Sequence, residues 1–412
     1  MNRLEKSERA VVVGVYTKSS EKRKAEETLL ELEELVHSAG GKVVGRVLHR
    51  RPRFDPAYLV GKGKIVEIAA MAEELKADLV VFDEPLSPAQ HRNIENIIKT
   101  KVLDRTQLIL DIFAQRAMTR EGKLQVELAQ LTYLLPRLTG RGQQMSRLGG
   151  GIGTRGPGEK KLEYDRRRIG ERIKKIKEEI SNVRKRREVQ RKHRKKDNIP
   201  TVALVGYTSA GKTTLFNLLT GEEKKISGAL FTTLDPILRR VTLPSGFPFL
   251  LSDTVGFIRK LPVELVTAFR ATLEEATEAD VLLHVIDISS ENYRDEVAAV
   301  EKTLADLGAI DKPIIKVYNK IDLLPKKEYF LEKNREDNYR VYISAKTGEG
   351  VEELLRKVES ILLNGIEIKT IIVPFSQQYK LEGIIKKSII LSKEVTEEGL
   401  KIKVGVKKNE TR

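Results

Sequence analysis

The first 120 residues alternate between short apolar runs and longer amphipathic segments. The apolar runs predict buried strands, and leucine or isoleucine at helical spacing predicts helices between them. The expected strands are Ala10–Tyr16 (AVVVGVY), 42–48 (KVVGRVL) and Asp78–Asp83 (DLVVFD). The expected helices cover Glu21–Ser38 and Ile65–Lys76, and a third opens with Ser87 and Pro88. Strands that alternate with helices predict a small parallel α/β domain over residues 1–120.

The next segment, residues 121–197, has the apolar spacing of two helices that pack along each other. In its second half, apolar residues recur at spacings of 4, 3, 4 and 3, which is typical of a coiled-coil seam. These residues are Ile169, Ile173, Ile176, Ile180 and Val183. The upstream stretch Gly122–Leu138 is amphipathic and is broken near Pro136. Its apolar positions are Val126, Leu128, Leu131, Leu134 and Leu135. We therefore expect an antiparallel helical hairpin.

The stretch between these two helices, residues 139–159, has an unusual composition. It contains eight glycines, three arginines and one proline, in the sequence TGRGQQMSRLGGGIGTRGPGE. So many glycines cannot pack a core, and we expect the backbone to move until a partner holds it. The hairpin is therefore expected to carry a flexible, basic tip.

Two regions complete the chain. Residues 198–364 have the alternating pattern of a second α/β domain. Residues 365–412 contain three apolar stretches, IKTIIVPF, KKSIILS and GLKIKVGV. These stretches predict short strands around one helix, and so a small α+β domain.

The charge of the chain is concentrated in the hairpin. The 412 residues include 75 Lys and Arg against 59 Asp and Glu, a formal charge of +16. Residues 160–196 alone hold 18 basic and 6 acidic side chains, which is a net +12. Arginines and the N–H groups of a glycine-rich loop suit RNA phosphates and exposed bases. An RNA-binding hairpin is the favoured interpretation, and a solvated charged helix with a linker is the alternative.

Other features of the composition exclude whole classes of chemistry. The chain has no cysteine, which excludes disulfides, thiolate metal sites and cysteine nucleophiles. The N-terminal sequence MNRLEKSERA has no apolar stretch of the signal-peptide kind, and no apolar run approaches the ~18 residues of a membrane span. We expect a soluble, cytoplasmic protein that is a monomer.

A phosphate-binding loop follows the first strand of the second α/β region. The stretch TVALVGYTSAGKTTLFN is an apolar strand, then Gly-x4-Gly-Lys-Thr, then a helix. Glycines let successive N–H groups turn toward phosphates. We expect Lys212 to reach the β- and γ-phosphates and the Thr213 hydroxyl to bind Mg²⁺. The whole loop consists of Gly206, Tyr207, Thr208, Ser209, Ala210, Gly211, Lys212 and Thr213.

A second motif provides a sensor for the γ-phosphate. The stretch LLSDTVGF ends a strand with Asp253, Thr254, Val255 and Gly256. Asp253 can hold the Mg²⁺ shell, and the Gly256 N–H can sense the γ-phosphate. Many GTPases place a water-orienting Gln directly after this glycine, whereas this chain has Phe257, which neither donates nor accepts. We therefore expect slow intrinsic hydrolysis that a partner accelerates.

Two later motifs predict that the base is guanine. An apolar strand ends in Asn319, Lys320, Ile321 and Asp322, and the Asp322 carboxylate can accept from both N1–H and the 2-amino group of guanine. Adenine has no such pair of donors. A third segment, Ser344, Ala345 and Lys346, follows the next strand and can present a backbone N–H to the guanine oxygen. Each motif stands at the carboxyl end of a strand, where such sheets bind ligands.

The segment between the first two motifs must supply a mobile threonine. Its sequence GALFTTLDPILRR contains Phe231, Thr232, Thr233, Leu234 and Asp235. We expect Thr233 to complete the Mg²⁺ shell with Thr213 and Asp253, and Thr232 is the alternative. We assign catalysis to Lys212, Thr233 and Gly256. The fold class is then α/β: a P-loop GTPase domain, preceded by a small parallel α/β domain and a helical hairpin, and followed by a small α+β domain.

The order of these parts resembles the HflX family of ribosome-associated GTPases over nearly the whole chain. The matching stretches are LVGKGK, VLDRTQLILDIFAQRA, GTRGPGE, GYTSAGKT, FTTLDP and DTVGFI. The resemblance implies binding to the large (50S) ribosomal subunit and its rRNA, and nucleotide-driven separation of ribosomal subunits under stress, with the tip near the peptidyl-transferase centre. It also implies ATP binding by the N-terminal domain, linked to RNA unwinding.

The loop Gly61–Lys64 (GKGK) is the candidate phosphate site of that N-terminal domain, and a plain strand-to-helix turn is the favoured alternative.

Three residues depart from the family pattern. Ser209 stands where the family usually has an Asn that helps related GTPases to bind a monovalent cation, so we do not expect potassium activation. Thr213 replaces the commoner Ser and keeps its hydroxyl. Lys160-Lys161 replace Thr-Gln and add charge at the root of the tip.

Two other functions fit parts of the chain. One is an ATP-dependent RNA-remodelling protein, with GKGK holding ATP and the basic hairpin opening duplex RNA. The other is a regulatory GTPase with a protein or membrane-surface partner. The narrow apolar seam argues against a membrane, because the neighbouring helix covers it.

Overall fold

The computed structural model describes residues 7–138, 157–196, 199–222, 230–233, 237–260, 275–324, 339–364, 366–380 and 389–407. The chain divides into two compact units, one formed mainly by Met1–Ser181 and the other mainly by residues 182–412. The expected tip falls largely outside the described residues.

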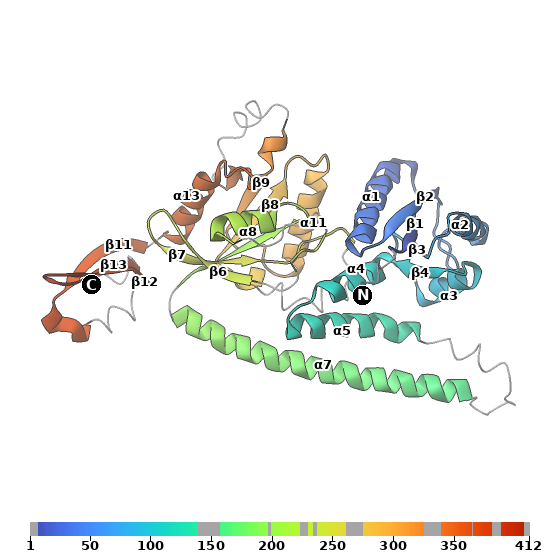
Figure 1. The fold of residues 1–412 in the computed structure, drawn as a ribbon, viewed down its shortest axis with the longest axis horizontal. Helices are drawn as coiled ribbons and strands as arrows, with labels where there is room; N and C mark the ends of the chain where they lie inside the picture. The colour runs from blue at the N-terminus through green and yellow to red at the C-terminus, as the bar shows by residue number, and fades with distance from the viewer. Residues whose placement is uncertain are drawn as a thin grey trace, which may run out of the picture. The chain divides into compact units, whose positions relative to one another are not determined.

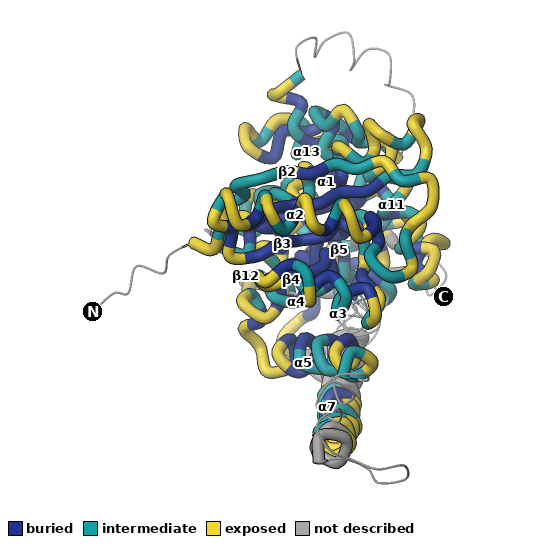
Figure 2. The backbone as a smooth tube through the Cα atoms, turned by 90° about the vertical axis from the view of Figure 1, so that its right-hand side faces the viewer, coloured by how far each residue is buried: buried dark blue, intermediate teal, exposed yellow. Residues whose placement is uncertain are grey.

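The first unit contains the predicted parallel sheet, with the strand order β2-β1-β3-β4. The strands are β1 (Arg9–Tyr16), β2 (Lys42–Arg50), β3 (Leu79–Phe82) and β4 (Lys101–Asp104). Strands β1 and β3 are buried along nearly their whole length (Figure 2), as expected for a parallel sheet that helices cover on both faces.

Helices cover both faces of this sheet (Figure 1). Helices α1 (Lys22–Ser38) and α4 (Arg105–Arg116) pack together on one face, and α2 (Lys62–Glu74) and α3 (Pro88–Ile97) cover the other. Ser87 caps α3 by accepting from the Gln90 N–H at 3.2 Å, as its sequence predicts. Helix α2 begins three residues before the expected Ile65, so most of the GKGK loop belongs to the first helical turn.

The predicted hairpin is formed by α5 (Arg120–Leu134) and α7 (Pro157–Lys196), which lie side by side (Figure 1). The seam residues Ile176 and Ile180 are buried against Leu124, with Leu128 and Leu131 beside them. A helix of 40 residues is about 60 Å long, so α7 is much longer than its partner. An added Cβ at Gly170 in α7 would meet no atom within 4 Å.

The first hairpin helix is broken near Pro136, as expected, and its α-helical part ends four residues before Leu138. Helix α5 stops at Leu134, and a 3₁₀ turn, η2 (Leu135–Arg137), follows it because Pro136 cannot continue an α-helix. Leu134 is 41% exposed and does not join the seam, whereas Leu124, which the pattern did not single out, does. Val126 is buried but lies outside this cluster.

The second unit is built on a six-stranded sheet with the order β10-β9-β8-β5-β7-β6, in which only β6 is antiparallel to its neighbour. The strands are β5 (Thr201–Gly206), β6 (Ile237–Thr242), β7 (Pro248–Asp253), β8 (Val281–Asp287), β9 (Ile314–Asn319) and β10 (Arg340–Tyr342).

Helices also cover this sheet on both faces. Helices α8 (Lys212–Thr220) and α13 (Val351–Leu362) share one apolar core with the sheet, and α11 (Tyr293–Asp306) packs against β5 and β8. This α/β arrangement confirms the fold class. It also places Gly206, Asp253 and Asn319 at the carboxyl ends of neighbouring strands.

The chain ends in a three-stranded antiparallel sheet, ordered β11-β13-β12. Its strands are β11 (Ile366–Val373), β12 (Ile389–Thr396) and β13 (Gly399–Lys407). The three predicted stretches therefore do form strands, and the described helix between them is the 3₁₀ helix η4 (Phe375–Lys380). None of the helices in the described part of the chain has the length and apolar character needed to cross a membrane.

Candidate nucleotide-binding site

The P-loop connects β5 to α8 and requires glycine at both of its ends. Gly206 has a φ of 151°, and an added Cβ would lie 2.3 Å from the Val285 carbonyl oxygen. Gly211 has a φ of 95°, and its Cβ would lie 2.2 Å from the Asn319 side-chain nitrogen. Side chains larger than hydrogen are therefore excluded by both backbone conformation and close neighbours. The loop is held tightly against β8 and β9, which lie on the same side of β5.

Lys212 lies buried at the centre of this loop. Its Nζ donates to the carbonyl oxygens of Gly206 at 2.9 Å and Tyr207 at 2.6 Å. Burial lowers the pKa of Lys212 to about 8, and the nearby carboxylate of Asp253 opposes that shift. A phosphate at this position would favour the charged form, which fits the role expected for this lysine.

Three oxygen-bearing side chains converge beside the loop. The Thr233 hydroxyl donates to Asp253 Oδ2 at 2.8 Å, and the Thr213 hydroxyl lies 3.3 Å from the same atom. The two hydroxyls are 3.2 Å apart. Thr232 reaches only Thr213, at 3.5 Å, so the geometry favours Thr233 over its neighbour.

These residues form a donor set that fits Mg²⁺. The ion prefers oxygen ligands and is usually held by one carboxylate together with phosphate oxygens of the substrate. Within the described residues no cluster of three His, Asp or Glu side chains offers an all-protein metal site. The set Thr213, Thr233 and Asp253 therefore suits an ion that arrives with the nucleotide.

The residues that follow Asp253 form hydrogen bonds with the P-loop. Phe257 donates its N–H to the Gly206 carbonyl at 3.1 Å, and its own carbonyl accepts from the Thr208 N–H at 2.8 Å. Further along, the Arg259 N–H donates to the Tyr207 hydroxyl at 2.8 Å. The Phe257 side chain is buried. It therefore offers no polar group for orienting water.

Gly256 fits closely against the P-loop. An added Cβ would lie 2.9 Å from Thr208 Cγ2 and 3.3 Å from Lys212 Nζ. The neighbouring Thr254 hydroxyl donates to the Leu204 carbonyl at 2.6 Å, and Val255 is buried. The backbone of Gly256 thus lies close to the lysine that is expected to hold the γ-phosphate.

Asn319 connects the two motifs that are expected to bind the base. Its Nδ2 donates to the Ala210 carbonyl at 2.8 Å, and its Oδ1 accepts from the Ala345 N–H at 2.9 Å. Ser344 and Ile321 are buried beside it, whereas Asp322 and Lys346 are exposed. The Ala345 N–H is therefore already bonded, and the Asp322 carboxylate is open to solvent.

The sequence did not reveal the role of Asp287. This residue ends β8 and lies opposite Asn319 on β9. Its Oδ2 binds Lys320 Nζ at 2.5 Å, and its Oδ1 accepts from the Ser289 N–H at 3.0 Å. Lys320 has a positive φ of 68°, so the ion pair fixes a strained residue beside the base site. The sequence signal that could have indicated this role is the position of Asp287 at the carboxyl end of the apolar strand VLLHVID, because such sheets bind ligands at that edge.

The remaining expected site residues are spread more widely. Ser209 is exposed and has a φ of 59°, and Phe231 is buried with a φ of 58°. Leu234 and Asp235 lie outside the described residues.

In the first unit, Arg51 lies against Gly61, donating to the Val60 carbonyl at 3.0 Å and to Asp55 at 3.0 Å. This contact closes one side of the GKGK turn.

The second unit combines a strand–P-loop–helix, a Thr-Asp oxygen set and an Asn-Lys-x-Asp segment at the carboxyl edge of one sheet. That combination defines a P-loop GTPase.

The comparisons with known proteins give the same class and extend it to the whole chain. Three family models match in succession: "GTP-binding GTPase N-terminal" over residues 26–114, "GTP-binding GTPase Middle Region" over 116–194 and "50S ribosome-binding GTPase" over 201–320.

Curated relatives match along nearly the full length. The chain is 47% identical to GTPase HflX of Caldanaerobacter subterraneus subsp. tengcongensis, covering 97% of this chain and 91% of that protein. It is 48% identical to the Lacrimispora saccharolytica protein of the same name, covering 95% and 92%. For the Escherichia coli GTPase HflX the identity is 44%, with 93% and 91% covered. The chain belongs to the HflX family of GTPases.

Proposed function

We propose that this GTPase binds the large ribosomal subunit through its basic hairpin and uses the GTP cycle to separate ribosomal subunits in the cytoplasm. The observation that supports this most directly is α7, a 40-residue helix with a strong excess of positive charge. The match of residues 201–320 to a family described as a 50S ribosome-binding GTPase supports the same partner.

Ion pairs between α5 and α7 hold the charged helix in a defined position. Arg172 binds both carboxylate oxygens of Glu127 at 2.7 Å, which joins α7 to α5 by a bidentate pair. Arg120 adds a contact to Glu179 at 3.1 Å. The outer side of α7 keeps its cations in solvent: Arg166, Arg167, Arg168, Lys174, Lys175 and Lys177. A row of exposed cations along one helix suits the phosphate backbone of structured RNA.

The nucleotide site supports hydrolysis that depends on the partner. Lys212 and the backbone of Gly256 would hold the γ-phosphate. Mg²⁺, when bound through Thr213, Thr233 and Asp253, would neutralise charge between the β- and γ-phosphates. Phe257 supplies no polar group to orient water, so the ribosomal subunit must supply or order one. Hydrolysis would then follow docking.

A rate measurement tests this proposal. We expect the purified protein to hydrolyse GTP slowly and large subunits to accelerate it at least tenfold, with small subunits as the control. Light scattering of 70S ribosomes should fall when the protein and a non-hydrolysable GTP analogue are added. A fast intrinsic rate that large subunits leave unchanged would contradict the proposal.

Two variants distinguish binding to the large subunit from separation of the ribosomal subunits. Deleting residues 149–156 removes the glycine-rich tip, which lies outside the described residues, and should abolish subunit separation while large-subunit binding stays within about tenfold, or about 1.4 kcal/mol. Reversing Lys174, Lys175 and Lys177 to glutamate should weaken binding and flatten its salt dependence. Ribosome splitting at the wild-type rate by the tip deletion would show that the tip is only a linker.

A further inference from the structure

Tyr164 is a large aromatic side chain that the hairpin leaves in solvent. It lies in the second turn of α7 and is 55% exposed. The buried seam residues Ile176 and Ile180 define the side of α7 that faces α5. At 100° per residue, Tyr164 lies about 140° around the helix from that side. The ring is therefore not part of the core that joins the two helices.

The side chains beside this ring are cationic. The Arg167 guanidinium lies 5.6 Å from the centroid of the Tyr164 ring, one helical turn away. Arg167 also faces Glu171, but their atoms are 3.9 Å apart and both side chains are at least 70% exposed, so water screens that pair. Arg166 and Arg168 are exposed on the same turns. Residues 163–172 hold four arginines against Glu163, Asp165 and Glu171, a net charge of +1, so the cations near the ring come mainly from the three arginines that follow it.

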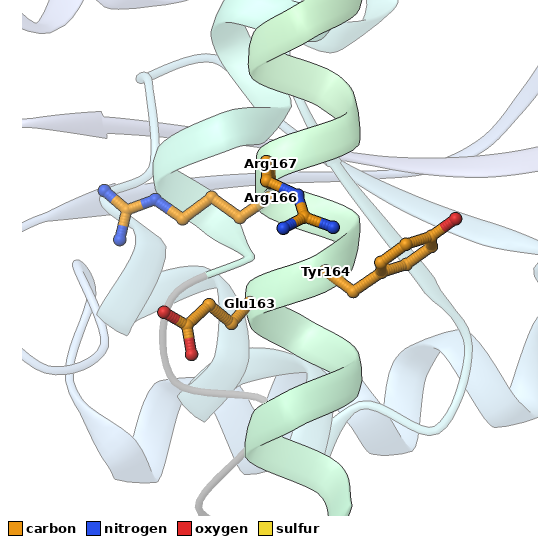
Figure 3. A pocket seen from close by; sticks show the side chains of 4 residues that line it. All are labelled: Glu163, Tyr164, Arg166 and Arg167. Atoms are coloured by element: carbon orange, nitrogen blue, oxygen red, sulfur yellow. The ribbon is translucent and has the colours of Figure 1, made fainter.

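An open hollow of about 590 Å³ surrounds these residues, and its described lining consists of Glu163, Tyr164, Arg166 and Arg167 (Figure 3). Glu163 and Arg166 project to one side of the helix, while Tyr164 projects to the other and Arg167 lies between them (Figure 3). The acidic group therefore points away from the face of the ring.

We propose that Tyr164 and Arg167 form a stacking site for an unpaired RNA base, with the neighbouring arginines holding the adjoining phosphates. This inference rests on the proposed function in one respect, because it takes the basic hairpin to be an RNA-binding element. Single-stranded RNA is read by aromatic rings and guanidinium planes on which bases stack, next to cations that follow the backbone. Duplex RNA stacks its base faces internally and offers phosphates, sugars and base edges, but no base face on which a ring could stack.

Charge complementarity favours RNA over other partners of this surface. A ring alone would suit an apolar partner, but Arg166, Arg167 and Arg168 follow it after Asp165, and residues 160–196 as a whole carry a net charge of +12, which favours a polyanion. Phosphate contacts by Arg167 and stacking by Tyr164 also differ in their response to salt, since only the former releases counterions. The two contributions can therefore be measured separately.

The test compares two RNAs that differ only in their bases. The full-length protein is titrated with a fluorescent 12-nucleotide oligouridine and with a strand of the same length whose central positions are abasic. We expect the wild type to prefer the strand with bases by about fivefold or more. Tyr164→Ala should remove that preference and Tyr164→Phe should keep it. Tyr339→Ala, which removes a similarly exposed tyrosine (54%) from the second unit, serves as the matched control.

Salt dependence provides a second readout. Tyr164→Ala should lower affinity for oligouridine without changing the slope of log affinity against log salt, whereas Arg167→Gln should reduce that slope by about 0.7. Since the chain has no tryptophan, Tyr164→Trp introduces a single indole, whose fluorescence should be quenched by RNA with bases and not by abasic RNA.

Each contrary result has a clear meaning. Equal loss of affinity for both strands on Tyr164→Ala, or a base preference that survives it, overturns the stacking site. Anionic vesicles that bind the wild type and lose affinity on Tyr164→Ala by as much as RNA does would instead indicate a membrane surface. If the base preference depends on Tyr164 but large subunits neither bind nor activate the protein, the proposed function fails and the stacking site stands.

Discussion

The side-chain amide of Asn319 donates to the backbone carbonyl of Ala210 at 2.8 Å, which links two residues 109 positions apart in the chain. Through its oxygen the same amide accepts from the Ala345 N–H. One buried side chain thus holds the phosphate loop and both base-recognition segments in a fixed relation. We therefore expect changes at Asn319 to affect base specificity and phosphate binding together.

The base specificity can be tested at Asp322. Asp322→Asn should weaken GTP binding at least tenfold, because an amide cannot accept from both donors of guanine. Xanthosine triphosphate should bind better to this variant than to the wild type, since its 2-oxo group meets an amide donor. Titration with both nucleotides measures the change, and Asp311→Asn, at another exposed aspartate of the second unit, is the control. Unchanged GTP affinity would refute the assignment.

Nucleotide affinity should depend on pH through Lys212. The pKa of its amine in the protein is about 8, and phosphates raise it on binding, so binding takes up a proton above that pH. Affinity for GDP should be nearly constant below pH 7 and should fall about tenfold between pH 7 and pH 9. Lys212→Arg, whose guanidinium stays charged, should bind more weakly overall and show no such decline. Isothermal titration at several pH values, in buffers of different ionisation enthalpy, measures the proton uptake.

The fold itself should be sensitive to acid through His284. This residue is buried on β8, its Nδ1 has no hydrogen-bond partner among the described residues, and burial lowers its pKa to about 3. The unfolded chain, with a pKa near 6.5, binds the proton more readily, so stability falls as pH decreases below 6.5. The free energy of unfolding should drop by about 2 kcal/mol from this site alone between pH 7 and pH 5.

Replacement of that histidine provides the check. His284→Leu should flatten this part of the pH dependence in urea unfolding, while His37→Gln, at an exposed position, should leave it unchanged. A pH profile that His284→Leu does not alter would show that other groups dominate acid unfolding.

Gly256 should be essential for hydrolysis but not for holding GDP. A methyl group there would press on Thr208 and lie beside the Lys212 amine, which obstructs the approach of this segment to a γ-phosphate. We expect Gly256→Ala to lower the subunit-stimulated GTPase rate at least tenfold, with GDP affinity changed by less than threefold. Gly63→Ala, where an added Cβ meets nothing within 4 Å, is the control. An unaffected rate would exclude the sensing role.

Potassium should not activate this GTPase. Ser209 is exposed in a left-handed conformation (φ 59°). Its short hydroxyl stands where the family resemblance implies an asparagine that helps to bind a monovalent cation. GTPase rates in potassium and sodium chloride should agree within about twofold. Ser209→Asn should gain a potassium preference, and it suits the backbone because Asn tolerates positive φ. Strong potassium activation of the wild type would show that the cation is held by other groups.

Much of the architecture was readable from the sequence because it depends on local patterns. The apolar run that forms β5 and the glycines of the P-loop fix strand, turn and helix within a few residues, and Ser87 fixes the start of α3. The hairpin was equally clear, since Ile176 and Ile180 can be buried only by a partner helix. The break near Pro136 was also readable, because proline cannot continue an α-helix, although the amphipathic pattern itself runs on to Leu138.

What the sequence did not reveal depends on contacts between distant residues. The pairing of Asp287 with Lys320, and the bond from Arg259 to the Tyr207 hydroxyl, join elements whose register is set by the whole sheet. The buried pair of Arg105 with Asp83, 2.8 Å apart at the carboxyl edge of the first sheet, belongs to the same category. The burial of a charged side chain leaves no local pattern in the sequence, because it is tolerated only when a partner that is distant in the chain pairs with the charge.

Gly170 is a position at which α7 can bend more easily than at its neighbours. Helix α7 is joined to α5 by the Arg172–Glu127 ion pair and by the burial of Ile176 and Ile180, whereas Gly170 lacks the side chain that stiffens its neighbours and costs about 1 kcal/mol of helix stability relative to alanine. The thirteen residues from Pro157 to Ile169 extend about 20 Å beyond Gly170. A bend of only about 10° at Gly170 would displace Pro157 by about 3.5 Å, roughly the thickness of one stacked base. Small bends of α7 would thus move its N-terminal turns while Arg172 stays paired with Glu127.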